Sequence, residues 1–159
     1  MAKIKEGADE SSSSSTSSPQ HHRTRILIVD DEEDVTFFLK KALEGNAGFE
    51  VVTFNDPLLA LSSFDNYNTD KEAGGGGTYD LILLDIKMPK MDGFELYQEL
   101  QKKVDDNGKI KVCFMTAFEV YYEALKELFP DSYPSVCFIK KPFSAQDLIN
   151  RISKEMSRS

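Results

Sequence analysis

Polar side chains that could do chemistry follow four short apolar runs of this chain. Asp30 and Asp31 come after residues 26–29, Asp85 after 81–84, Thr116 after 112–115, and Lys141 after 136–140. Three carboxylates in one crevice would repel one another and need a cation, and an all-oxygen ligand set suits Mg²⁺. A lysine and a threonine facing that cation would bind the oxygens of a phosphoryl group, which one carboxylate could accept as an acyl phosphate. The residue types therefore predict a magnesium-dependent phosphoryl site, provided that the fold brings them together.

The elements that must position these residues alternate along the chain. Short apolar runs predict strands buried on both faces, at 25–29, 49–54, 79–84, 110–115 and 136–139. Helical spacing predicts helices at about 34–44, 56–64, 93–104, 120–129 and 144–156. Asp56 with Pro57, and Ser144, predict helix starts, whereas Gly45 and Asn46 predict the end of the first helix.

This alternation predicts an α/β fold with a doubly wound, five-stranded parallel sheet between two layers of helices. We expect the strand order 2-1-3-4-5, whose switch point lies between the first and third strands. Ligands of such sheets bind at the carboxyl ends of the strands beside the switch point. Asp30, Asp31 and Asp85 would then meet where a ligand is expected.

Composition narrows the protein class. Hydrophobic residues make up 40% of the 159 residues, enough for a core, and the formal net charge of -8 disfavours a nucleic-acid-binding surface. The sequence has no apolar run of about 18 residues and no apolar signal-peptide region at its start, so we expect a cytoplasmic protein.

Several segments are not expected to contribute residues to the phosphoryl site. Residues 1–23 are serine-rich and predict a disordered tail before a domain at 24–157. His21 and His22 lie in that tail and offer too few ligands for a metal site. The glycine run 74–77 leads into a strand rather than a helix, which favours a flexible connector over a phosphate cradle.

The two cysteines, Cys113 and Cys137, both lie in apolar strand patterns. We expect them to be small buried hydrophobic residues. A disulfide between them requires neighbouring strands and Cα atoms within about 7 Å of each other.

The chain resembles the receiver domain of two-component response regulators, the CheY-like proteins, over about residues 24–156. The resemblance rests on the motifs ILIVDDE at 26–32, DIKMPKMDG at 85–93, MTA at 115–117 and KPF at 141–143. It implies that Asp85 is the phosphoacceptor and that Asp30 and Asp31 bind Mg²⁺, Asp31 directly and Asp30 through metal-bound water.

The resemblance also assigns the residues around the phosphoacceptor. The backbone carbonyl of Lys87 matches the third protein ligand of the metal, and the backbone amides of Lys87 and Ala117 match groups that bind the phosphoryl oxygens. Thr116 matches the switch hydroxyl, and Lys141 matches the family's lysine before a proline whose peptide bond is usually cis. Phe138 occupies the switch aromatic position, although it lacks the hydroxyl of the common tyrosine.

By this resemblance we expect a response regulator rather than an enzyme, apart from its own phosphorylation and dephosphorylation. Because the sequence ends soon after the last predicted helix, we expect it to be stand-alone. Its expected donor is a sensor histidine kinase or a histidine phosphotransfer protein. Its expected output is a separate protein that recognises the surface of helix 120–129, strand 136–139 and helix 144–156. The sequence does not distinguish direct signalling to that protein from relay of the phosphoryl group to a further histidine. The loop 66–78 and the segment 129–135 depart from the family pattern.

Two other functions are less compatible with the sequence. A haloacid-dehalogenase-type phosphatase would need a carboxylate two residues after its nucleophile, where this chain has Lys87. A docking module that works without phosphorylation would have no use for the full set of candidate site residues, namely Asp30, Asp31, Asp85, Thr116 and Lys141.

Overall fold

The computed structural model describes residues 23–65, 79–104, 110–118, 121–128 and 137–158. These residues contain one parallel sheet of five strands in the order β2-β1-β3-β4-β5, which confirms the predicted fold class and order. The strands are β1 (Arg25–Val29), β2 (Glu50–Phe54), β3 (Leu81–Asp85), β4 (Lys111–Thr116) and β5 (Cys137–Lys140).

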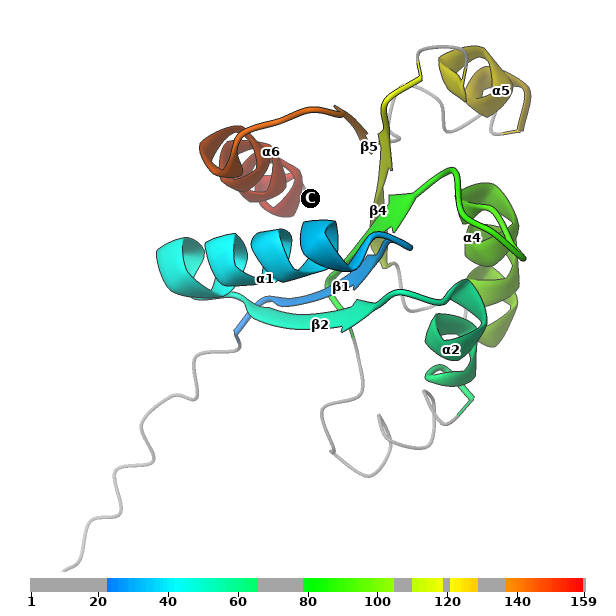
Figure 1. Ribbon diagram of the computed structural model, residues 1–159, viewed down its shortest axis with the longest axis horizontal. Coiled ribbons are helices and arrows are strands. Elements are labelled where there is room, and N and C mark those ends of the chain that lie inside the picture. The colour runs from blue at the N-terminus through cyan, green and yellow to red at the C-terminus, as the bar shows by residue number, and fades with distance from the viewer. Residues whose placement is uncertain (1–22, 66–78, 105–109, 119–120, 129–136, 159) are drawn as a thin grey trace, which may run out of the picture.

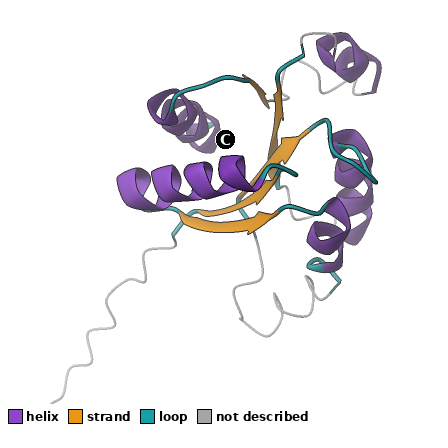
Figure 2. Cartoon of the chain, viewed as in Figure 1, coloured by secondary structure: helices purple, strands orange, loops and turns teal. Residues whose placement is uncertain are grey.

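Helices cover both faces of the sheet (Figure 1). They are α1 (Glu33–Ala47), α2 (Pro57–Ser62), α4 (Gly93–Lys103), α5 (Tyr121–Leu128) and α6 (Ala145–Ser157). Figure 2 shows α1 and α6 on one side of the strands and α2, α4 and α5 on the other. The core is accordingly split into two clusters, one under Leu39 of α1 and Leu148 of α6, the other under Phe94 and Leu96 of α4.

The central strands explain the continuous apolar runs. All five residues of β3 are buried, including Asp85, and so are the four apolar residues that end β1. Because successive strand residues point to opposite faces, a strand between two helical layers must be apolar at every position. The polar residues can therefore appear only where these strands end.

The predicted helix starts are confirmed at Asp56 and Ser144, whose side chains accept hydrogen bonds from the first-turn amides of α2 and α6. The predicted end of α1 was wrong. The helix continues through Gly45 to Ala47, and Gly48 ends it with a φ of 67°. A glycine stops a helix where the chain needs a left-handed turn, and that turn lies at Gly48.

The interpretation of the cysteines as unpaired was wrong, although their burial was predicted correctly. Cys113 and Cys137 form a disulfide between β4 and β5. The register pairs them directly, and their Cα atoms are 4.4 Å apart, within the range of a disulfide.

Other predictions lie outside the described residues. They concern the serine-rich tail with His21 and His22, the glycine run 74–77, and the segment 129–135. Among the described helices, none is long and apolar enough to cross a membrane.

Candidate functional site

The candidate site lies along the carboxyl edge of the sheet. Asp30 follows β1, Asp85 and Thr116 are the last residues of β3 and β4, and Lys141 follows β5. Backbone hydrogen bonds join neighbouring strand ends, from Asp30 N to Phe54 O (3.2 Å), from Ile86 N to Met115 O (3.1 Å) and from Lys141 N to Thr116 O (2.8 Å). These hydrogen bonds hold the strand ends side by side and so fix the backbone positions of the site residues.

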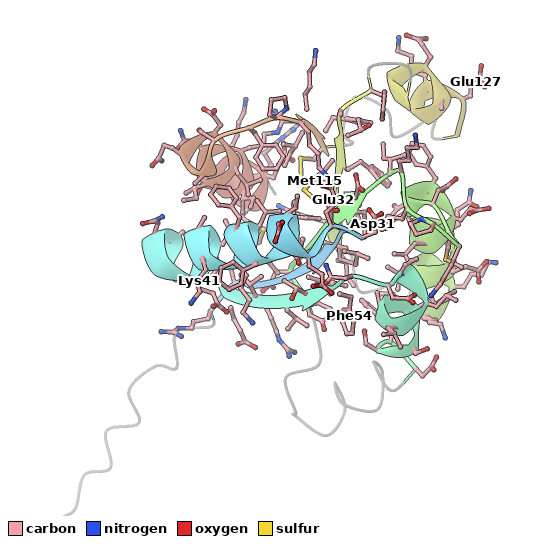
Figure 3. The ribbon with its side chains drawn as sticks, in the orientation of Figure 1. Asp31, Glu32, Lys41, Phe54, Met115 and Glu127 are labelled. Atoms are coloured by element: carbon pink, nitrogen blue, oxygen red, sulfur yellow. A yellow bond between two sulfur atoms is a disulfide. The ribbon has the colours of Figure 1, made fainter. Side chains whose placement is uncertain are left out.

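Three carboxylates converge on this edge. Asp30, Asp31 and Asp85 each offer an oxygen, and these oxygens all lie within 4.8 Å of one another. Asp30 is fully buried, Asp85 is 6% exposed and Asp31 faces solvent. Figure 3 shows Asp31 and Glu32 beyond the end of β1, where α1 begins. The cluster is therefore buried on its inner side and open on its outer side.

Lys141 bridges two of these carboxylates. Its Nζ lies 2.6 Å from Asp30 Oδ2 and 3.3 Å from Asp85 Oδ1. Burial alone would lower the pKa of Lys141, but the hydrogen bond and charge of Asp30, helped by Asp85, raise the pKa above its ordinary value. Lys141 thus stays charged and offsets only one of three carboxylates. An oxygen-only donor set with this excess of negative charge fits Mg²⁺.

Among the three carboxylates, Asp85 has a strongly raised pKa. Burial, reinforced by the charge of Asp30, raises the pKa of Asp85 from 3.8 to about 7, although Lys141 opposes the shift. A carboxyl group with this pKa changes its charge near neutral pH. A cation bound beside it would favour the ionised, nucleophilic form.

Thr116 is the last residue of β4, the strand next to β3, which ends at Asp85. It is buried, and its Oγ1 accepts a hydrogen bond of 3.0 Å from the amide of Phe118. Ala117 between them is exposed. The Nζ of Lys87, two residues after Asp85, lies 5.2 Å from the centroid of the Phe118 ring. The loops after β3 and β4 therefore meet beside the phosphoacceptor candidate.

The start of α4 is packed tightly against the end of β3. A Cβ atom on Gly93 would lie 2.4 Å from the carbonyl oxygen of Asp85, closer than a side chain can come. The amide of Gly93 donates to the carbonyl of Ile86 at 2.8 Å. A glycine at this position is thus required for the loop that leaves Asp85.

Phe138 and the KPF motif complete the predicted set. Phe138 is half-buried on β5, and its ring centroid lies 6.2 Å from that of Phe114 on β4. The Lys141–Pro142 peptide is cis, as the resemblance implied. A pocket of about 380 Å³ borders Lys141 and is also lined by Val35, Phe38 and Phe143.

Asn55 is a further residue of this edge, and the sequence patterns did not predict it. Its Nδ2 donates to the backbone carbonyl of Asp30 at 2.8 Å and to Thr36 Oγ1 at 2.9 Å. Asn55 therefore ties the end of β1 to the first turn of α1 and holds the backbone beside the acidic cluster of Asp30 and Asp31. The strand-end rule would have found it, because Asn55 is the residue directly after β2.

Comparison with known proteins agrees with the fold. Residues 26–153 match the family model described as the response regulator receiver domain, so the chain belongs to this family. A curated relative is the response regulator receiver protein CpdR of Brucella abortus (strain 2308). It is 33% identical over 117 residues, which cover 74% of this chain and 83% of CpdR.

Solved structures give the same result. The response regulator TrrA of Thermotoga maritima, crystallised in complex with Mg²⁺ and BeF, is 31% identical with a TM-score of 0.61 over 83% of this chain and 98% of TrrA. A CheY-like receiver domain protein from Methanospirillum hungatei JF-1 is 25% identical with a TM-score of 0.65 over 84% of this chain and 94% of its own. Receiver domains are phosphoacceptor domains of two-component signalling and receive their phosphoryl groups from histidine kinases.

Proposed function

We propose that this protein accepts a phosphoryl group on Asp85 in a Mg²⁺-dependent reaction. The donor is a phosphohistidine of a sensor histidine kinase or a histidine phosphotransfer protein. The observation that supports this most is the convergence of Asp85 with Asp30, Asp31 and Lys141 at the carboxyl edge of a parallel sheet. Family membership supports the same function.

In the transfer step, a carboxylate oxygen of Asp85 attacks the phosphorus atom. The new bond is an acyl phosphate O–P bond, and the P–N bond to the donor histidine breaks with its electron pair left on the imidazole. Asp85 must be ionised to attack. The nearby ammonium of Lys141 favours that form and then binds an oxygen of the transferred group.

Asp30, Asp31, Asp85 and the carbonyl of Lys87 would hold the Mg²⁺ ion. When bound, the ion neutralises the negative charge of the phosphoryl oxygens and of the acidic cluster. Asp30 is positioned for this task by the hydrogen bond from Asn55 to its backbone, and its own carboxylate is held by Lys141. The backbone amides of Lys87 and Ala117 donate to the remaining phosphoryl oxygens.

The output follows from the added charge. A phosphoryl group brings about -1.5 to -2 charges and three acceptor oxygens. The Thr116 hydroxyl reorients toward this acceptor, and Phe138 turns inward into the space that Thr116 leaves. The surface of α5, β5 and α6 changes with them and is recognised by a separate protein. In a relay, a second histidine takes the phosphoryl group from Asp85 instead.

The remaining assignments concern the whole chain. We infer that residues 24–157 act as the receiver and that this receiver works in the cytoplasm.

Intact-mass spectrometry tests the phosphoacceptor directly. With acetyl phosphate and Mg²⁺ the protein should gain one phosphoryl group, whereas Asp85→Asn should gain none. Asp65→Asn is the matched control, because Asp65 is an exposed aspartate that pairs with Lys103 on the surface. Equal labelling of wild type and Asp85→Asn would refute the assignment of Asp85.

The docking-module alternative is tested by partner capture. A protein that binds the phosphorylated form and not Asp85→Asn supports the switch. A partner bound equally by both forms would favour a module that works without phosphorylation.

A further inference from the structure

The disulfide occupies a defined place in the sheet. Cys113 and Cys137 form one register pair of the β4–β5 ladder, and they are the only two cysteines of the chain. Cys113 is fully buried and Cys137 is 3% exposed. The bond therefore joins β4 to the strand at the end of the sheet inside the core, rather than on the surface.

This crosslink lies close to the site along the chain. Thr116 is three residues after Cys113, and Lys141 is four residues after Cys137. β5 has only four residues, and β4 is the strand with which it pairs in the described sheet. The disulfide thus fastens the start of a short ladder whose other end holds Thr116 and Lys141.

The disulfide and the switch aromatic lie on opposite faces of the same two strands. Cys113 and Cys137 belong to the core cluster under α1 and α6. Phe114 belongs to the cluster on the other face, and Phe138 packs against that cluster. The bond can therefore restrain the separation of the two strands without contacting Phe138.

The closed loop is large. The two cysteines are 24 residues apart in sequence, and α5 lies between them. The chain-entropy relation for a loop of 24 residues corresponds to a change of about 300-fold in an opening equilibrium that the crosslink restricts. This value is the upper limit for opening of β5 away from β4, because such an opening frees at most this loop once the bond is broken.

We propose that Cys113 and Cys137 are a thiol–disulfide exchange site whose redox state sets how firmly β5, and with it Lys141, is held against β4. The co-reactant is a dithiol. Its thiolate attacks one sulfur and forms a mixed disulfide, while the other cysteine leaves as a thiolate and takes up a proton. The second thiol of the co-reactant then displaces the remaining cysteine, so that two electrons pass from the dithiol to the protein.

Burial determines how this exchange proceeds. Neither cysteine is accessible in the closed sheet, so the dithiol reacts only when β5 opens. The consequence for the site rests on the proposed function. The oxidised protein holds Lys141 in place for phosphoryl transfer, and the reduced protein transfers more slowly because that position is less fixed.

The test compares the full-length protein in its oxidised and dithiothreitol-reduced forms. Alkylation in denaturant, followed by mass spectrometry, should find no free thiol in the first form and both in the second. Amide hydrogen exchange at residues 137–141, measured without a phosphodonor, should accelerate by roughly 10- to 300-fold on reduction. The rate of Asp85 labelling by acetyl phosphate and Mg²⁺ should fall by about threefold or more on reduction, a change worth about 0.65 kcal/mol.

The control is a Cys113→Ala/Cys137→Ala double variant, which should respond to the reductant in neither readout. Should it fail to fold, Cys137→Ala alone serves, because it also lacks the bond. Unchanged exchange at 137–141 in the reduced wild type would overturn the proposal, as would a reductant response of the control. Redox-dependent exchange without Asp85 labelling in either form would instead refute the proposed function and leave the exchange site standing.

Discussion

Replacing Asp85 with asparagine should stabilise the metal-free protein at alkaline pH. Asp85 is 6% exposed, and its pKa is raised from 3.8 to about 7, chiefly by burial and then by the charge of Asp30. An acid whose pKa is higher in the folded state binds more protons there than in the unfolded state. Its ionisation therefore costs stability as the pH rises from about 4 to about 7.

The magnitude follows from the size of the shift. A difference of about three pKa units corresponds to about 4 kcal/mol at most, and relaxation around the charge reduces this to about 2–4 kcal/mol at pH 8. Asparagine keeps the shape of the side chain and carries no charge. Lys141 keeps its bond of 2.6 Å to Asp30 in the variant, so the substitution leaves no charge without a partner.

The assay is urea or thermal unfolding of wild type and Asp85→Asn in a chelating buffer at pH 4 and pH 8. At pH 8 the variant should melt about 4–16 °C higher, and at pH 4 the difference should nearly vanish, since both side chains are then neutral. Mg²⁺ should stabilise the wild type more than the variant at pH 8. A variant less stable than wild type at pH 8 without metal would refute the electrostatic reasoning.

Three further substitutions test the parts around Asp85. Gly93→Ala should lower the free energy of unfolding in urea by at least about 2 kcal/mol. The reason is that the alanine Cβ would lie 2.4 Å from the carbonyl oxygen of Asp85. An unchanged unfolding midpoint would contradict this prediction. Asn55→Ala should weaken Mg²⁺ binding in calorimetry by roughly tenfold through loss of its bond to the Asp30 carbonyl, and Asn55→Ser should restore part of it. Asp31→Ala should weaken Mg²⁺ binding by at least about tenfold, because Asp31 belongs to the acidic cluster. The melting temperature of the metal-free protein should stay nearly unchanged, because Asp31 is exposed. A wild-type Mg²⁺ affinity would exclude Asp31 as a metal ligand.

The sequence alone was sufficient for the layout of the sheet. A strand covered on both faces has no place for a polar side chain, so apolar runs marked the strands, and the first polar residue marked each strand end. Right-handed crossovers between parallel strands then left few orders to choose from. For this reason the order of residues along the chain is enough to place Asp30, Asp85, Thr116 and Lys141 on one edge of the sheet.

Features that depend on register and burial needed the tertiary structure. Cys113 and Cys137 look like any two cysteines in apolar strands, and only the pairing of β4 with β5 brings their Cα atoms to 4.4 Å. Gly45 and Gly48 could each end α1 by residue type, and the structure shows that Gly48 does so, with a left-handed backbone and its amide bonded to the carbonyl of Leu43. The contact of Asn55 with the Asp30 carbonyl arises because β2 lies beside β1, although 25 residues separate the two in sequence.

The charge state of Asp85 also depends partly on local sequence and partly on tertiary structure. The residue type and its place after an apolar run follow from local sequence, since side-chain periodicity is a local property of the backbone. The pKa of about 7 depends on how much water the fold excludes and on how close Asp30 and Lys141 come, 55 and 56 residues away along the chain. Desolvation and Coulomb interactions act through space, so the sequence determined which groups meet at this edge, and the tertiary structure decided the pKa of Asp85.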